Sequence, residues 1–406
     1  MTKDQRQWTI RELVLAGELE FGDGYRTKRS ELGASGFPIL RVAEVLDGKI
    51  APVYSEFVRP EFRSAIRQKI ARPGDIVLTT KGTVGRVAVI PAQSAEFSYS
   101  PQVCYFRTTG GNRVISRYLY YWLRSDEFRV QAAGLKGQTD MADYLNLADI
   151  GSLKVTLPEL QSQRSITEIL GALDDKISVN ERIAETALAL AKARIEAVEH
   201  AEPMCIGDVA DVFDGPHATP QKTTEGPWFL SISSLKGGVL DLAESAHLTE
   251  DDFPRWTRRV QPRAGDVLFS YETRLGEAAL MPSDVRASLG RRMGLLRPKP
   301  GAVRSALLLH AYLSPRFQEE IRRRTVPGAT VDRIPLKELS TWPISLPVAG
   351  VREQLSAALE ALHALIDQMT VENRTLVELR NTLLPQLVTG EIRVKDAVRV
   401  VEDIAS

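Results

Sequence analysis

The sequence predicts an α+β protein in which two tandem α/β domains are each followed by a long helix. Three observations predict this architecture: a length of 406 residues, a duplication with a period of about 190 residues, and an amphipathic helical segment at the end of each copy. A chain of this length exceeds one ordinary hydrophobic core. We expect domains at residues 1–157 and 203–346, helical segments at 158–202 and 347–390, and a C-terminal tail at 391–406.

The duplication covers most of the chain. The run GFPILRVAEVLDGKI, from Gly36, aligns with GPWFLSISSLKGGVL, from Gly226, and each predicts a strand followed by a glycine-containing turn. RPGDIVLTTKGTVGRVAVIP, residues 72–91, aligns with RAGDVLFSYETRLGEAALMP, residues 263–282. Because the period is too long for a solenoid repeat, the chain contains two copies of one domain-plus-helix unit.

The two helical segments begin at Pro158 and Pro347. A proline is tolerated in the first helical turn, where amide hydrogens have no partner. Apolar residues recur at three- and four-residue steps, and the expected core positions are Ile166, Leu173, Ile177, Leu355, Leu362 and Ile366. Mutual packing would bury both apolar stripes, so we expect an antiparallel coiled coil with pseudo-twofold symmetry. Each helix of about 40 residues would span on the order of 60 Å and separate the two domains.

Charge is distributed unevenly although the formal net charge is zero. Residues 1–157 carry 22 basic and 17 acidic side chains, and residues 203–346 carry 19 and 17, whereas residues 158–202 carry 5 and 9 and residues 347–406 carry 6 and 9. The basic domains favour a nucleic-acid partner only slightly. No run of 18 apolar residues and no apolar signal core occurs, so we expect a cytoplasmic protein without a membrane partner.

Conventional catalytic motifs are missing from the sequence. The five histidines are scattered, and there is no phosphate-binding glycine loop, nucleophile elbow or His/Cys ligand cluster. Cys104 and Cys205 form no ligand spacing and are expected to act as small core residues. We therefore expect a binding protein with no metal site.

Polar, basic loops are the candidate binding elements. In the first copy the loop TTKGTVGR carries Thr79, Thr80, Lys81, Thr83 and Arg86, whose side chains could approach phosphates or base edges. The alternative is a β-hairpin with solvated charges. The second copy keeps the frame but carries Tyr271, Glu272 and Arg274. Two copies that share glycines and differ in side chains would suit two readers of different sequences.

Two further segments are weaker candidates. The helix end at Arg324 precedes a small-residue loop with Thr330, and the matching loop of the first copy carries Lys136, Gln138 and Thr139. These side chains could hold a phosphate or meet a base edge, although the pattern also describes an ordinary helix C-terminus. His217 and Thr219 lie in the loop DGPHATPQK, where they are either ordinary polar loop residues or nucleic-acid contacts.

The chain resembles the specificity subunits of type I restriction-modification systems. The resemblance lies in the frames GDIVLTTKGTVG and GDVLFSYETRLG, the segment ILGALDDKI, and the C-terminal LRNTLLPQLVTGEIRV. It implies two target-recognition domains that each read one half of a split, asymmetric site in double-stranded DNA. It also implies helical regions that space the domains and dock methyltransferase subunits, with a restriction/motor subunit joining the complex. S-adenosylmethionine, ATP and Mg are then expected on the partner subunits, with no cofactor in this chain.

Two other functions remain open. The chain could be a fragment of a fused restriction-methylation enzyme, for which an Asn/Asp-Pro-Pro-Tyr/Phe motif would be evidence, and the sequence has none. It could also be a coiled-coil scaffold that binds only proteins. The expected protein is a non-catalytic subunit whose target sequence the chain does not reveal.

Overall fold

The computed structural model describes residues 6–51, 53–135, 137–138, 143–201, 203–328 and 331–405, with the backbone alone at 137, 138 and 402–405. The chain divides into two compact units, which we call unit 1 (Met1–Ile177 with Thr375–Ser406) and unit 2 (Ser178–Arg374). Both divisions fall inside long helices, α6 (Leu160–Glu196) and α12 (Ala349–Thr389). Each unit therefore combines one α/β domain with a part of both helices.

Unit 1 contains an antiparallel sheet in the order β2-β9-β6-β7. Its strands are β2 (Leu19–Asp23), β9 (Val103–Thr108), β6 (Ile76–Thr79) and β7 (Val87–Val89). Side chains alternate between the two faces of a strand. Ile76 and Leu78 accordingly enter the core beneath the helices, while Val77 enters a second apolar cluster with Leu40 and Tyr99. Both faces are covered, which explains the unbroken apolar run of β6.

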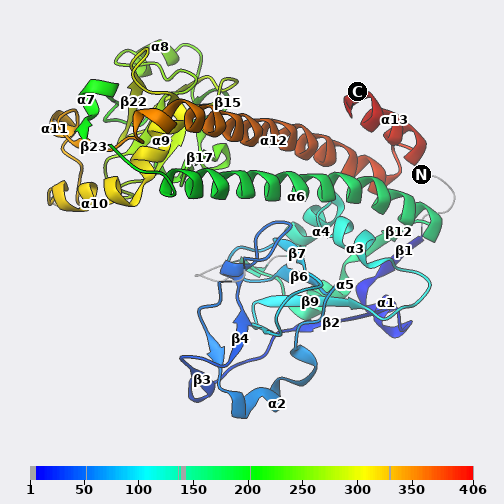
Figure 1. Cartoon of the computed structure of the whole chain (residues 1–406). Helices are drawn as coiled ribbons and strands as arrows, with labels where there is room; N and C mark the ends of the chain where they lie inside the picture. Colours follow the sequence, from blue (N-terminus) through cyan, green and yellow to red (C-terminus); the bar gives the residue numbers. More distant parts are fainter. Residues whose placement is uncertain are drawn as a thin grey trace. The chain divides into compact units, whose positions relative to one another are not determined.

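A second sheet of unit 1 has the order β3-β5-β4-β8, and β4 pairs with β8 in parallel. The strand β1 pairs antiparallel with β12 and so connects the start of the domain to its end. Figure 1 shows α3 and α4 between the β2-β9-β6-β7 sheet and the unit 1 part of α6. The remaining elements of unit 1 are β1 (Arg6–Thr9), α1 (Ile10–Leu15), β3 (Leu32–Gly33), β4 (Phe37–Leu40), β5 (Phe57–Val58), α2 (Arg63–Ile66), β8 (Ser98–Tyr99), α3 (Ser116–Trp122), α4 (Asp126–Leu135), β10 (Gly137–Gln138), β11 (Asp143–Tyr144), α5 (Leu147–Ser152), β12 (Lys154–Leu157) and α13 (Val394–Ala405).

Unit 2 repeats this topology, with a sheet in the order β14-β22-β19-β20. Its strands are β14 (Ala210–Asp214), β22 (Met293–Pro298), β19 (Val267–Ser270) and β20 (Ala278–Leu280). The main sheets agree with the predicted duplication, whereas the second sheets differ, with the order β3-β5-β4-β8 in unit 1 and β18-β15-β21 in unit 2. The remaining elements are β13 (Met204–Cys205), α7 (Ile206–Val209), β15 (Thr223–Phe229), β16 (Leu235–Lys236), β17 (Val239–Leu240), β18 (Ala246–His247), α8 (Phe253–Trp256), β21 (Ala287–Ser288), α9 (Ser305–Leu313), α10 (Pro315–Arg324), α11 (Leu336–Leu339) and β23 (Pro343–Ile344).

A buried ion pair fixes the central strands of each sheet. In unit 1 the carboxylate of Asp75 accepts hydrogen bonds from Arg107 Nε at 2.7 Å and Nη2 at 2.6 Å, and from the amide of Arg72 at 2.9 Å. In unit 2 Asp266 accepts from Arg297 Nε and Nη2 at 2.9 and 2.7 Å. These bidentate pairs join the Gly-Asp turn to the neighbouring strand. In unit 1 the turn precedes β6 and the neighbour is β9, and in unit 2 the turn precedes β19 and the neighbour is β22.

The long helices pack antiparallel within each unit. In unit 2 the amide of Val348 donates to the carbonyl of Glu199 at 3.1 Å, whereas Asn180, near the other end of this segment, donates to Glu372 at 2.8 Å. In unit 1 Arg380 contacts Asp174 at 2.8 Å. Of the expected core positions, Ile166, Leu173, Leu355 and Ile366 are buried, while Ile177 and Leu362 are half-buried.

Asn180 marks a local twofold relation between the two helices. The runs VNER at Val179 and VENR at Val371 are equivalent in the duplication, so Asn180 corresponds to Glu372. The Asn180 side chain donates to Glu372 and to Asn373 and is itself fully buried. A side chain that contacts its own counterpart lies near the local axis. A buried amide of this kind sets the register of a helical pair at some cost in stability.

The segment ILGALDDKI contains a glycine and an aspartate, Gly171 and Asp174, that make specific contacts within unit 1. Arg117 donates to the carbonyl of Gly171 at 3.1 Å, and a Cβ at residue 171 would lie 2.6 Å from the Arg117 guanidinium carbon. Asp174 accepts from the Tyr121 hydroxyl at 2.8 Å and also pairs with Arg380. The glycine and the aspartate therefore hold α3 and α12 against α6.

Unit 2 replaces this polar contact with a histidine pair. The Nε2 atoms of His310 on α9 and His363 on α12 lie 2.9 Å apart, and both side chains are buried. Burial lowers the pKa of His310 to about 3 and that of His363 to about 4. Both imidazoles are therefore neutral at neutral pH, which allows one ring to donate and the other to accept.

The helix boundaries differ slightly from those expected. Pro158 and Pro347 each precede the first helical residue by two positions, and their carbonyls accept from Gln163 and Arg352. At the far end, Gly390 adopts φ +75° directly after α12, a conformation that favours glycine and ends a helix. The segment predicted as a tail then forms α13.

The buried pair yields a stability prediction. Asp75→Asn leaves the Arg107 guanidinium buried beside a neutral amide, and we expect unit 1 to lose about 3–5 kcal/mol of unfolding free energy. Chemical denaturation followed by tryptophan fluorescence would measure the loss. The matched control is Asp126→Asn, which removes an exposed ion pair with Arg129 and should cost less than about 1 kcal/mol. Equal effects of the two substitutions would contradict the anchoring role of Asp75.

Candidate nucleic-acid interface

The loop between β6 and β7 is built from two threonines that face inward. Thr79 is fully buried; its hydroxyl donates to the carbonyl of Thr83 at 2.5 Å and accepts from the amide of Arg86 at 2.9 Å. The Thr80 hydroxyl is also buried and donates to the carbonyl of Gln102 at 3.0 Å. The expectation that both side chains reach a ligand is therefore corrected: these hydroxyls shape the loop.

The outward-facing side chains of this loop are Lys81 and Thr83. Both are exposed, and Lys81 forms no ion pair within the part of unit 1 that the structure describes. Arg86 is half-buried, and its Nη1 donates to the carbonyl of Val45 at 3.3 Å. Gly82 and Gly85 adopt φ +79° and +99°, which lets the loop turn back within six residues of β6. The free donors of the loop are thus concentrated at Lys81 and Thr83.

A second predicted segment lies beside this loop in unit 1. The backbone of Lys81 bridges to Tyr144, and the amide of Leu145 donates to the carbonyl of Thr80 at 2.9 Å. The hairpin β10-β11, which ends at Tyr144, therefore adjoins the Lys81 loop. Lys136 and Thr139 lie outside the described residues, as does the side chain of Gln138.

Unit 2 brings the equivalent segments together. Glu272 bridges to Arg333, which also bridges to Val326, and the amide of Ile334 donates to the carbonyl of Tyr271 at 2.9 Å. A hollow of about 540 Å³ lies between them and is lined by Arg274 and Asp332 among others. Thr330 lies outside the described residues. In each unit the segment after the basic helix end thus adjoins the loop that follows the central strand, a proximity that the sequence did not predict.

The loop of unit 2 has a buried aromatic residue where unit 1 has Thr80. Tyr271 is 5% exposed, and burial, together with the nearby Asp214, raises the pKa of its hydroxyl. The hydroxyl therefore stays protonated, and the ring packs in the core of unit 2. The prediction that Tyr271 contacts a ligand directly is corrected, because its side chain is inaccessible in this structure.

Charges in the unit 2 loop are paired with one another. Arg274 contacts Glu277 at 3.2 Å and the carbonyl of Ser233 at 3.3 Å, and Arg292 contacts Glu272 at 2.9 Å. This loop consequently offers fewer free cations than its counterpart in unit 1.

Arg324 is also engaged within unit 2. Its Nε donates to Glu320 at 2.8 Å, and its guanidinium lies over the ring of Trp342. The hydrogen bonds from Arg323 and Arg324 lower the pKa of Glu320, whose carboxylate remains charged. The arginine run therefore stabilises the end of α10, as expected of basic residues at a helix C-terminus.

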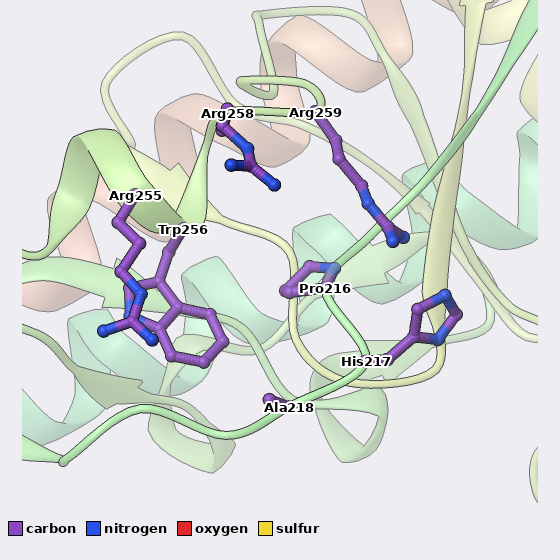
Figure 2. A pocket seen from close by; sticks show the side chains of 7 residues that line it. All are labelled: Pro216, His217, Ala218, Arg255, Trp256, Arg258 and Arg259. Carbon is purple, nitrogen blue, oxygen red and sulfur yellow. The ribbon is translucent and has the colours of Figure 1, made fainter.

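His217 and Thr219 lie at another edge of unit 2. Both are exposed, and His217 Nε2 lies 3.0 Å from the Asp214 carboxylate. Figure 2 shows His217 at the rim of a pocket with Arg255, Trp256, Arg258 and Arg259. Sequence reasoning named His217 at this edge and missed Trp256. The interleaved run RWTRR was the available signal, because basic and aromatic residues together are typical of nucleic-acid surfaces.

Two general features concern cofactors and membranes. Among the described residues, His, Cys, Asp and Glu side chains form no group of three or more that could hold a metal ion. Within the same residues, every helix is too short or too polar to cross a membrane.

Comparisons with known proteins converge on one family. Residues 16–188 match the family model described as the type I restriction modification DNA specificity domain. A putative type I restriction enzyme MjaX specificity subunit of Methanocaldococcus jannaschii is 22% identical over 426 aligned positions, covering 96% of this chain and 94% of that protein. The MjaVIII specificity subunit of the same organism is 23% identical over 181 positions, or 43% of this chain and 41% of that one.

A solved structure shows the same fold. The S subunit of a type I restriction-modification system from M. genitalium superposes with a TM-score of 0.53 at 13% identity, covering 95% of this chain and 97% of that one. The α+β fold with two repeated domains and two long helices is therefore shared with that protein. The chain thus matches the DNA specificity domain over residues 16–188 and is similar along nearly its whole length to a type I restriction enzyme specificity subunit.

Proposed function

We propose that this chain is the DNA sequence-specificity subunit of a type I restriction-modification complex and that it reads a split, asymmetric site. The observation that carries the proposal is the pair of equivalent loops after β6 and β19. Both keep the same strands and the second turn glycine, Gly85 or Gly276, yet Lys81 in unit 1 corresponds to Glu272 in unit 2. A shared backbone with opposite side-chain charge suits two readers of different half-sites.

The chemistry of the two loops supports readout of different bases. A lysine donates to the O6 and N7 acceptors of guanine in the major groove, whereas a carboxylate accepts from the N4 amino group of cytosine. Lys81 is free to donate; Glu272 would first have to release Arg292. In this proposal unit 1 contacts DNA with a preformed donor, and unit 2 rearranges an ion pair on binding.

We also propose that the chain is non-catalytic. The side chains available at the candidate loops are hydrogen-bond donors and acceptors suited to recognition, and the sequence carries no Asn/Asp-Pro-Pro-Tyr/Phe motif. Methyl transfer from S-adenosylmethionine, and ATP- and Mg-dependent steps, would belong to methyltransferase and restriction subunits bound to this chain.

The helices are the proposed docking site for those partners. An apolar groove of about 470 Å³ in unit 2 is lined by side chains of α6 and α12, including Ile183, Leu190, Leu362 and Leu365. Leu190 is 42% exposed and Val179 is 48% exposed. Exposed apolar surface between two helices favours a protein partner. We propose that a methyltransferase subunit covers this groove, while the helices act as the spacer between the two reading domains.

Methylation mapping tests the proposed function. The chain would be co-expressed with its methyltransferase subunit, and the host genome would be compared with and without the chain. We expect adenine methylation at a bipartite sequence only when the chain is present. Methylation by the chain alone would favour the fused-enzyme alternative, and partner binding without any sequence preference would favour the scaffold alternative.

Lys81→Ala should weaken binding to the cognate duplex. Removal of an exposed donor that contacts a base edge costs about 1–3 kcal/mol of discrimination, so titration with labelled duplexes should show lower affinity for the cognate site and a smaller preference over a scrambled one. Lys154→Ala, at an exposed position on β12, serves as the matched control and should leave both values unchanged. If the two variants had the same affinity and the same preference for the cognate duplex, the Lys81 loop would not be part of the DNA interface.

Leu190→Asp should prevent assembly with the methyltransferase subunit. The exposed position leaves the fold intact, but docking would bury an unpaired carboxylate, and a loss of at least about 1.4 kcal/mol lowers affinity tenfold. Co-purification and analytical ultracentrifugation would measure the loss. The matched control is Leu15→Asp, at the exposed end of α1. Complexes of normal composition with both variants would argue against the groove as the docking site.

A further inference from the structure

Each unit holds two basic side chains around the aspartate that ends the first strand of its main sheet. In unit 1 Asp23, the last residue of β2, accepts from Lys69 Nζ at 2.9 Å and lies 3.6 Å from Arg26 Nη2. Lys69 also donates to the carbonyl of Gly24 at 2.7 Å. A Cβ on Gly24 would lie 2.0 Å from the carbonyl oxygen of Tyr99, so only glycine fits at this strand end. Lys69 is thus held by two acceptors at a fixed place.

Unit 2 repeats the arrangement with different side chains. Asp214, the last residue of β14, lies 3.1 Å from Arg259 Nη1 and 3.0 Å from His217 Nε2. Arg259 also donates to the carbonyl of Gly215 at 2.9 Å, as Lys69 does to Gly24. The aspartate and the glycine are identical in the two units, whereas the basic side chains differ. The feature kept through the duplication is therefore an aspartate that positions two basic side chains.

Arg259 and His217 border a pocket of about 400 Å³ in unit 2. Figure 2 shows Arg258 and Arg259 on one side and the loop of Pro216 and His217 across from them, with the Arg255 guanidinium near the Trp256 ring. Arg258 is exposed and has no ion-pair partner within the described residues of unit 2. The residues that line the pocket include three arginines and no carboxylate, and of these arginines Arg259 is paired with Asp214.

The geometry points to a binding site for a DNA backbone phosphate in this pocket, an inference that rests on the proposed function. Arg258 donates to the phosphate, Arg259 and His217 are held in place by Asp214, and the Trp256 ring forms an apolar wall against the neighbouring deoxyribose. Guanidinium groups bind phosphate oxygens through paired N–H donors. Contacts to phosphate fix the position of a protein on the duplex and carry no sequence information directly.

This assignment explains why the feature survives in both units while the loops diverge. A contact that reads bases must change with the target, but a contact to the backbone serves any target. It also supplies positive charge to unit 2, where Arg274 and Arg292 are neutralised by Glu277 and Glu272. The pocket and the loop thus divide positioning and reading between them.

The test is the salt dependence of DNA binding by the full chain in complex with its methyltransferase subunit. Two labelled duplexes are the probes. One carries the bipartite sequence identified by methylation mapping, and the other carries a scrambled sequence. Each neutralised phosphate contributes about 0.9 to the slope of log K against log salt concentration. We expect Arg258→Ala to reduce this slope by about 0.9 for both duplexes and to lower the affinity for both by a similar factor. We expect Arg258→Lys to retain the slope of the wild-type complex.

Arg316→Ala, at an exposed arginine on α10, is the matched control and should leave the slope unchanged. An unchanged slope for Arg258→Ala, or weaker binding of the methylated sequence only, would overturn the phosphate site. These results are separable from failure of the proposed function, which would appear as wild-type complex that does not distinguish the two duplexes.

Discussion

The geometry of both candidate interfaces depends on a buried carboxylate–guanidinium pair. Asp75 with Arg107, and Asp266 with Arg297, join the Gly-Asp turn to the strand beside it. The turn starts β6 or β19, and the candidate loop begins where that strand ends. Because a strand of four residues has little freedom once its start and its pairing are fixed, the ion pair also fixes where the loop emerges. Charge burial is costly, and it is compensated here by bidentate hydrogen bonds and a backbone amide.

Within each domain, buried side chains of the loop fix its backbone, and exposed side chains are left to vary. Thr79 in unit 1 and Ser270 in unit 2 direct their hydroxyls into the loop backbone, at Thr83 and Glu272. Internal hydrogen bonds therefore determine the loop conformation, and the exposed side chains do not. Positions such as Lys81 and Thr83 consequently change chemistry without a large change in stability, since substitutions at exposed sites usually shift it by less than about 0.5 kcal/mol. A scaffold of this kind suits recognition of varied sequences.

Much of the fold was predictable because its signals are local or repeated. The aligned frames from Arg72 and Arg263 indicated the central strands, and the apolar stripes indicated α6 and α12. The burial of Thr79 and Tyr271 was not predictable, because a threonine or tyrosine in a polar loop has the same sequence signature whether it faces inward or outward. The contact between Asp23 and Lys69 joins residues 46 positions apart, and neither residue belongs to a recognisable motif. The exposed or paired state of Arg274 likewise depends on Glu277 and Ser233, which only the folded loop brings together.

The long helices show how a duplicated chain becomes asymmetric without losing its fold. Asn180 contacts its own counterpart Glu372, so the two helices already differ at their local axis. The difference grows where the helices meet the domains: Tyr121 bonds to Asp174 in unit 1, whereas His310 meets His363 in unit 2. Each contact joins two side chains of one unit, and the other unit has different residues at the equivalent positions. Such paired substitutions favour one pairing of helix and domain over the swapped one, because exchanging partners would leave a buried carboxylate or imidazole without its hydrogen bond.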